Sequence, residues 1–115
     1  MSSEHQASLH ELEILEHNLQ HLSMQKQTIQ LELNETINAL NEIEKTNDEV
    51  YRVLGNIMLR ADKSLLRKEL EEKKRVLALR LEACEKQEAL LEKKAQDLSR
   101  KSTQISQSKN ESHNA

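Results

Sequence analysis

The sequence predicts an all-α dominated chain, a long antiparallel two-helix coiled coil with one β-hairpin at the end where the chain turns back. Apolar residues recur at alternating steps of three and four in both halves, which is the spacing of the a and d positions of a coiled coil. A short strand–turn–strand pattern separates the two halves. The 115 residues include no proline, one glycine and one aromatic residue, a composition typical of long helices rather than of a globular core.

The first helix is expected from about residue 8 to about residue 45. Ser8 and Glu11 have the spacing of a capping box. The seam residues are Leu12, Leu15, Leu19, Leu22, Ile29, Leu33, Leu40 and Ile43. Lys26 at an a position and Thr36 at a d position interrupt this seam. Polar seam residues can fix the alignment of two helices, but for Lys26 we favour the simpler interpretation that its ammonium group extends into water.

A β-hairpin is expected over residues 49–61. Residues 46–48 favour local side-chain hydrogen bonds that end the helix, and Gly55-Asn56 supplies a tight turn between two strands. Nothing in the chain covers the apolar hairpin, and its edges leave backbone groups unpaired. We therefore expect hairpins from several subunits to assemble into β-barrels. The residues expected to mediate this assembly are Val50, Tyr51, Val53, Leu54, Gly55, Ile57, Met58 and Leu59.

The second helix is expected from about residue 64 to about residue 106, with Asp62 or Ser64 as its N-cap. Its seam residues are Leu70, Leu77, Leu81, Cys84, Leu91, Ala95, Leu98 and Ile105. Several a positions are polar, so this seam is thinner than the first and suits pairing with a stronger partner helix. Residues 107–115 are expected to form a polar, frayed tail. The whole chain, residues 1–115, is then one structural unit.

The charge distribution favours pairing of the first helix with the second. Residues 1–48 contain nine acidic residues against two lysines, whereas residues 49–115 contain fifteen basic residues against eleven acidic ones. Like charges disfavour pairing of either helix with its own copy. The lysines and arginines of the second helix alternate with glutamates and face an acidic helix, so we expect no nucleic-acid partner.

Other chemistry is only weakly indicated. His17 and His21 have the i,i+4 spacing of helical zinc ligands, with His10 nearby, but a solvated helix face is the favoured interpretation. Cys84 occupies a seam position as a small apolar residue. No phosphate loop or nucleophile motif is present, so we expect neither an enzyme nor a cofactor. Because we see no secretion signal and no membrane span, and because a single cysteine suits a reducing compartment, we expect a cytoplasmic protein with no membrane partner.

The hairpin and the residues after it carry a resemblance to a known family. The segment from Val50 to Leu70, VYRVLGNIMLRADKSLLRKEL, and the segments 25–28 and 34–36 resemble the beta class of the prefoldin family, of archaeal type. The resemblance spans about Leu12 to Ile105. It implies a hexamer of two alpha-class and four beta-class subunits, a cytosolic chaperone that captures unfolded polypeptides without ATP and passes them to a group II chaperonin. Alpha-class chains carry two hairpins, and one is present here.

In such a chaperone, clients would be held at the free tips of the coiled coil. The candidate residues are Leu9, Leu12, Ile14, Leu15, Leu98 and Ile105. Ordinary seam packing is the competing interpretation, and it is favoured for Leu12, Leu15 and Leu98. Ile14 falls at a c position, off the seam, and is therefore the better candidate. Four other off-seam residues could line an inner cavity or contact a neighbouring subunit: Met24, Leu31, Val76 and Leu79.

The alternative function is a structural coiled-coil adaptor that dimerises without handling unfolded clients. It would require the acidic first helix to meet its own copy, and it leaves the hairpin without a purpose.

Overall fold

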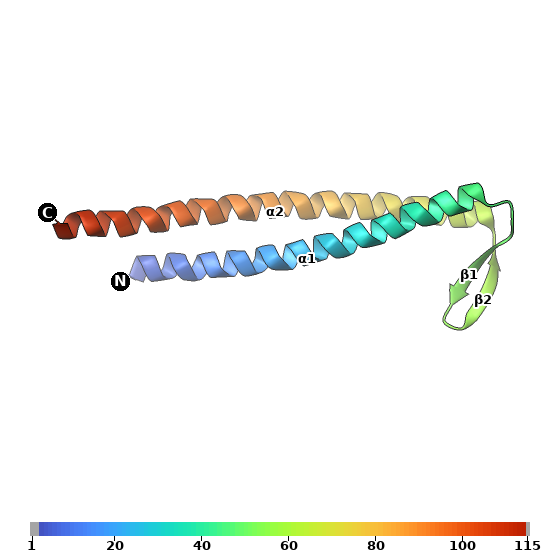
Figure 1. Ribbon diagram of the computed structural model, residues 1–115, viewed down its shortest axis with the longest axis horizontal. Helices are drawn as coiled ribbons and strands as arrows, with labels where there is room; N and C mark the ends of the chain where they lie inside the picture. The colour runs from blue at the N-terminus through green and yellow to red at the C-terminus, as the bar shows by residue number, and fades with distance from the viewer. Residues whose placement is uncertain (1–2, 115) are drawn as a thin grey trace. The chain divides into compact units, whose positions relative to one another are not determined.

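The structure, a computed structural model, describes the backbone of residues 3–114 and the side chains of residues 3–104. It contains two long helices, α1 (Ser3–Lys45) and α2 (Lys63–Asn114), and between them two strands, β1 (Val50–Leu54) and β2 (Ile57–Ala61) (Figure 1). The strands form an antiparallel two-stranded sheet. Two long helices with one hairpin between them confirm the predicted fold class.

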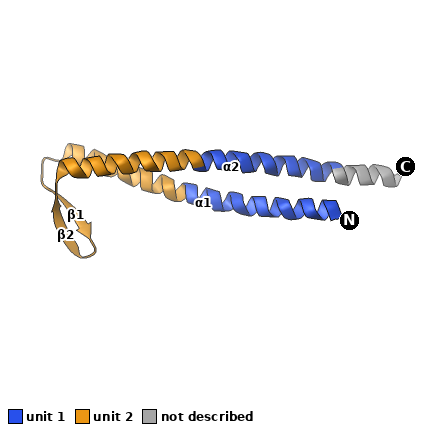
Figure 2. Ribbon diagram, turned by 180° about the vertical axis from the view of Figure 1, so that it is seen from behind, with its two compact units in different colours: residues 1–26, 84–115 blue, residues 27–83 orange. Residues whose placement is uncertain are grey.

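The residues cluster into two compact units, and both helices run through both units (Figure 2). Unit 1 combines residues 1–26 with residues 84–115, and unit 2 comprises residues 27–83. In unit 1 the helices run antiparallel, since the Cys84 thiol donates to the Leu22 carbonyl over 3.4 Å and His5 Nδ1 lies 3.4 Å from Ser102 Oγ. In unit 2, Arg67 Nε lies 2.6 Å from Glu44 Oε1 across the two helices.

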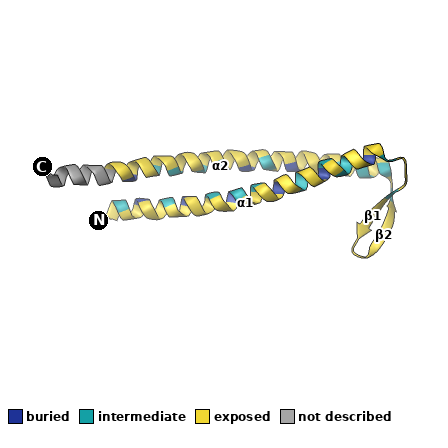
Figure 3. Ribbon diagram, viewed as in Figure 1, coloured by how far each residue is buried: buried dark blue, intermediate teal, exposed yellow. Residues whose placement is uncertain are grey.

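The helices bury the faces that the heptads predict (Figure 3). Every predicted d residue of α1 is at most 9% exposed: Leu15, Leu22, Ile29, Thr36 and Ile43. In α2, Leu77 and Cys84 are buried likewise. The Thr36 hydroxyl, although 3% exposed, donates to the Glu32 carbonyl over 2.8 Å. The buried Thr36 hydroxyl therefore has a hydrogen-bond partner within its own helix. Thr residues in helices often bond in this way to the carbonyl four residues earlier.

The helix α1 begins earlier than predicted, at Ser3 rather than near residue 8. Ser8 is not an N-cap but a helical residue that is 8% exposed. The heptad position of Ser8 explains its burial, because Ser8 lies one heptad before Leu15 and so continues the buried d series. The residues between Ser3 and Ser8 include neither glycine nor proline and therefore allow the helix to extend.

Side-chain hydrogen bonds mark both helix ends that flank the hairpin. Beyond the last residue of α1, Thr46 Oγ1 accepts from the Asp48 backbone N–H over 3.2 Å. Asp62 Oδ1 accepts from the backbone N–H groups of Ser64 and Leu65, over 2.9 and 3.2 Å. Asp62 is therefore the N-cap of α2, and Ser64 lies inside the helix.

At its other end, α2 continues to Asn114 instead of ending near residue 106. The segment that composition suggested as a polar tail is helical up to that residue. No glycine or proline follows Lys63, and Ser, Gln, Asn and Lys all have tolerable helix propensity. Polarity alone was a poor indicator of where this helix stops.

The hairpin turns through two residues. Leu54 pairs with Ile57, which leaves Gly55 and Asn56 as the loop. Gly55 has a φ of 60°, and no other described residue has a positive φ. Positive φ at the first central position alone is the pattern of a type II′ turn, which matches the twist of the flanking strands.

Candidate functional site

The hairpin exposes most of the apolar side chains that the sequence assigned to assembly. Val53, Leu54, Ile57 and Met58 are between 55% and 66% exposed, and Tyr51 and Leu59 are close to half exposed. Val50, at the base of β1, is partly covered. The predicted residues thus form one contiguous exposed surface, the hairpin surface, within unit 2.

The strand register divides the hairpin surface between two faces. Directly paired residues project to the same side of a sheet, and successive residues alternate. The Leu54–Ile57 pair therefore shares one face with Leu59, and the Val53–Met58 pair lies on the other. A sheet with one face in water usually alternates apolar and polar residues. Here both faces are apolar near the turn, so both faces need cover.

The edges of the hairpin are also unpaired in the part of the chain that the structure describes. The sheet has only β1 and β2, so each strand has one edge whose backbone groups lack a ladder partner. A two-stranded sheet is marginally stable in water by itself. The hairpin therefore combines two apolar faces with two unpaired edges.

Polar contacts tie the base of the hairpin to α2 and to the segment between α1 and β1. Arg52 of β1 pairs with Glu69 of α2, and Arg60 of β2 pairs with Glu49. The Tyr51 hydroxyl donates to Glu49 Oε2 over 2.9 Å. The Lys63 ammonium donates to the Thr46 carbonyl over 2.6 Å. The base is therefore tied down while the turn end remains exposed.

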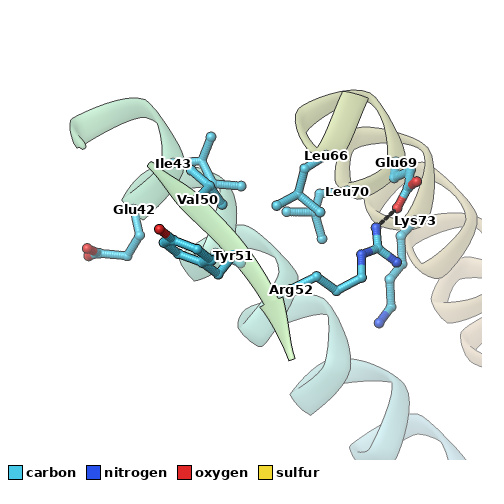
Figure 4. A pocket seen from close by; sticks show the side chains of 10 residues that line it. Glu42, Ile43, Val50, Tyr51, Arg52, Leu66, Glu69, Leu70 and Lys73 are labelled. Carbon is cyan, nitrogen blue, oxygen red and sulfur yellow. Dashed lines mark hydrogen bonds and ion pairs between the residues drawn. The ribbon is translucent and has the colours of Figure 1, made fainter. Parts of the chain in front are cut away.

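A cavity of about 520 Å³ lies in unit 2 between the base of β1 and the two helices (Figure 4). Ile43, Leu66 and Leu70 supply apolar walls, and Val50 and Tyr51 line it from the strand. Sequence reasoning did not identify this cavity. The one clue was Leu66, an apolar residue outside the predicted a and d series.

The predicted client-binding residues differ in exposure within unit 1. Leu9 and Ile14 are 36% and 47% exposed, whereas Leu15 is 9% exposed. Leu12 and Leu98 are half-buried. The side chain of Ile105 lies outside the described residues. Leu9 and Ile14 are therefore the two whose apolar surface is available without opening the seam.

The four off-seam apolar residues that the sequence singled out are exposed. Met24, Leu31 and Leu79 are more than half exposed, and Val76 is 39% exposed. Leu65 and Leu90 are also exposed, at 59% and 63%, and were not singled out from the sequence. Their f and c positions in the α2 heptad could have identified them.

The potential metal-ligating side chains of the described residues are dispersed along the helices. Among them, no three His, Cys, Asp or Glu side chains gather closely enough to hold a metal ion. On the exposed surface of α2, the Arg75 guanidinium donates to Glu72 over 2.6 Å and lowers the pKa of that carboxyl group. No helix in the described part of the chain is long and apolar enough to cross a membrane.

Comparison with known proteins shows which family has this sequence and architecture. The family described as "Prefoldin subunit" matches residues 6–110. The chain is 41% identical over 98 residues to prefoldin subunit beta of Thermococcus onnurineus, a match that covers 84% of each chain. It is 38% identical to prefoldin subunit beta of Pyrococcus furiosus, again over 84% of each chain.

Solved structures agree with these sequence matches. The crystal structure of the prefoldin beta subunit from Thermococcus strain KS-1 superposes with a TM-score of 0.83 at 36% identity, over 90% of this chain and 93% of that one. The beta2 subunit from the same strain gives a TM-score of 0.67 at 19% identity, which shows a shared fold.

Proposed function

Since this chain belongs to the prefoldin family, a family of chaperones, we propose that it is a beta-class subunit of a heterohexamer of two alpha-class and four beta-class chains. In this proposal the hexamer captures unfolded polypeptides in the cytoplasm without ATP and delivers them to a group II chaperonin. The observation that carries the proposal is the single hairpin, which exposes apolar side chains on both faces and leaves both edges unpaired.

Assembly follows from what the hairpin lacks. Its free edges would pair with strands of neighbouring subunits, and closure into a β-barrel would remove every edge. One barrel face would lie inside and one would meet the rest of the assembly, so the apolar pairs of both faces would be covered. An alpha-class chain, with two hairpins, would join hairpins from separate beta-class chains.

Client capture is assigned to the tip of the coiled coil in unit 1. Leu9 and Ile14 expose apolar surface there, and both lie close to the end of α1, where helices open most readily. Several small apolar contacts suit a binding mode that tolerates many sequences and releases them again. Leu12, Leu15, Leu98 and Ile105 would contribute when the end of the seam frays.

A deletion separates assembly from capture. Removal of residues 1–14 together with residues 99–115 should leave the hexamer with its alpha-class partner intact and abolish suppression of client aggregation. Retention of capture by the truncated hexamer would show that the tips are not the client site. A chain that forms a dimer by itself and never joins an alpha-class partner would indicate a coiled-coil adaptor instead.

A further inference from the structure

The two sides of the helix pair in unit 1 differ in charge around the exposed Leu9. In an antiparallel pair, the g positions of both helices flank the seam on one side and the e positions flank it on the other. The structure has this arrangement, since Asn18 and Gln25 of α1 line one pocket together with Gln87 of α2, and all three occupy g positions. Leu9 occupies an e position and therefore lies on the opposite side of the seam.

The side that carries Leu9 has carboxylates but no cation among the described residues. Its charged members are Glu13 and Glu16 of α1 and Glu85 and Glu92 of α2, at b and e positions, and all four are exposed. Within residues 3–104, none of these carboxylates forms an ion pair with a lysine or arginine. The other b and e positions of unit 1 in this range hold uncharged residues: Gln6, Leu9, Gln20, Ser23, Ala89, Gln96, Ser99 and Thr103.

The cations of unit 1 lie elsewhere around the helix pair. Residues 3–25 of α1 contain neither lysine nor arginine. On the g side, Glu4 and Glu11 of α1 share their side of the seam with cations of α2, so the charge there is mixed. In residues 84–104 of α2, all the cations occupy f or g positions: Lys86, Lys93, Lys94, Arg100 and Lys101.

Leu9, Glu13 and Glu16 form one small surface, which we name the tip face. Residues four and seven positions apart lie on the same face of a helix, so both carboxylates lie on the side of Leu9. Leu9 is 36% exposed, and both glutamates are exposed. The tip face therefore combines accessible apolar surface with negative charge that no neighbouring cation compensates.

We propose that the tip face favours unfolded segments in which an apolar residue lies within a few positions of lysine or arginine, and that Glu13 and Glu16 determine this preference. The inference rests on the proposed function, since it assigns a class of client to the tip. An apolar side chain of the segment covers Leu9 while a neighbouring cation reaches a carboxylate. An acidic segment brings like charges together at the same place and is disfavoured.

The preference biases the choice among clients without holding any one of them tightly. Ion pairs in water are individually weak and are screened by salt. A long unfolded chain can contact several tips of one assembly at once, and weak contacts then reinforce one another. Selection by charge is therefore compatible with release.

Two fluorescent peptides of equal length and identical apolar residues test the proposal. One carries lysines and the other glutamates at the intervening positions, and fluorescence anisotropy measures their binding to the full-length chain in complex with its alpha-class partner, without chaperonin. The lysine peptide should bind about fivefold more tightly. At an ionic strength of about 1 M, where the screening length is about 3 Å, this advantage should largely disappear.

Charge removal on each side of the seam identifies the residues responsible. Glu13→Gln with Glu16→Gln should lower the advantage of the lysine peptide to less than about twofold. The matched control, Glu4→Gln with Glu11→Gln, removes two exposed carboxylates of the same helix on the g side and should retain most of the advantage. An equal loss in both variants would overturn the proposal, because net charge alone would then explain the preference.

The same measurement separates this inference from the proposed function. Equal binding of both peptides by the unchanged complex would overturn the inference and leave capture at the tips standing. Binding of neither peptide would overturn the proposed function, and the inference with it.

Discussion

Lys26 Nζ lies 3.3 Å from Glu88 Oε1, which joins the two helices of unit 1. Both residues occupy a positions, and their side chains are 38% and 20% exposed. The favoured expectation for Lys26 was an ammonium group directed into water, and the structure shows it paired instead. Lys26 and Glu88 would each weaken the seam alone, but here the two side chains pair with each other across it. A slipped register would leave the Glu88 carboxylate partly buried without its partner, so the pair favours one alignment of the helices.

A double-mutant cycle should reveal this coupling. Lys26→Met and Glu88→Gln alone each leave one charge without its partner, whereas the double variant removes both charges. We expect a coupling energy of about 0.5–1 kcal/mol in the free energy of unfolding, a value limited by the exposure of the pair. Urea denaturation of the four proteins measures it. Additive effects of the two substitutions would show that the ion pair does not stabilise the helix pairing.

An acidic residue in the hairpin surface should disrupt assembly. Ile57→Asp places a carboxylate at a position that is 60% exposed in the single chain but is expected to be covered in the assembly. Leu90→Asp is the matched control, since Leu90 is 63% exposed and lies on α2, outside the hairpin. Light scattering should show a smaller species for Ile57→Asp and an unchanged one for Leu90→Asp. An unchanged mass for both would rule out the hairpin as the assembly surface.

Exposed tip residues should affect capture without affecting stability. Leu9→Ser and Ile14→Ser together remove exposed apolar surface, and the free energy of unfolding should change by less than about 0.5 kcal/mol per site. Suppression of client aggregation should fall clearly. Leu15→Ala, in the buried seam, should instead cost about 2–3 kcal/mol through the cavity it leaves. If Leu9→Ser with Ile14→Ser captures clients as well as the unchanged chain, the exposed tip is not where they bind.

Position 55 of the hairpin turn should accept D-alanine more readily than L-alanine. Gly55 has a φ of 60°, and nothing lies within 4 Å of the position that a Cβ would take. The cost of Gly55→Ala is therefore backbone strain alone, about 1–2 kcal/mol. Semisynthesis with D-alanine, which prefers positive φ, should stabilise the turn by about 0.4–1 kcal/mol. Thermal unfolding of the assembled protein compares the two, and equal midpoints would contradict the assigned turn.

Much of this fold follows from periodicity. The a and d series predicted which face of each helix is buried, since Leu15, Leu22 and Ile29 are covered as expected. Turn chemistry located the hairpin, because Gly55-Asn56 between two short, mainly apolar runs leaves few alternatives. The helix ends were less predictable. The capping-box spacing at Ser8 also suits a helix interior, and a polar composition does not by itself stop α2.

Only those features of the candidate site that depend on local sequence pattern were predictable. Exposure of the hairpin surface follows from the absence of any further element to cover it. The Lys26–Glu88 pair and the cavity beside Val50 depend on how two distant segments align, which a heptad assignment for each helix leaves open. For Leu12, Leu15 and Leu98, seam position and exposure agree on a packing role, so their part in capture depends on fraying that a single folded state does not display.

Native mass spectrometry of this chain mixed with an alpha-class prefoldin subunit tests the central claim most directly. The account predicts a complex with two alpha-class subunits and four copies of this chain, and its loss when Ile57 is replaced by Asp. A chain that stays monomeric or dimeric beside a well-folded alpha-class partner would contradict it.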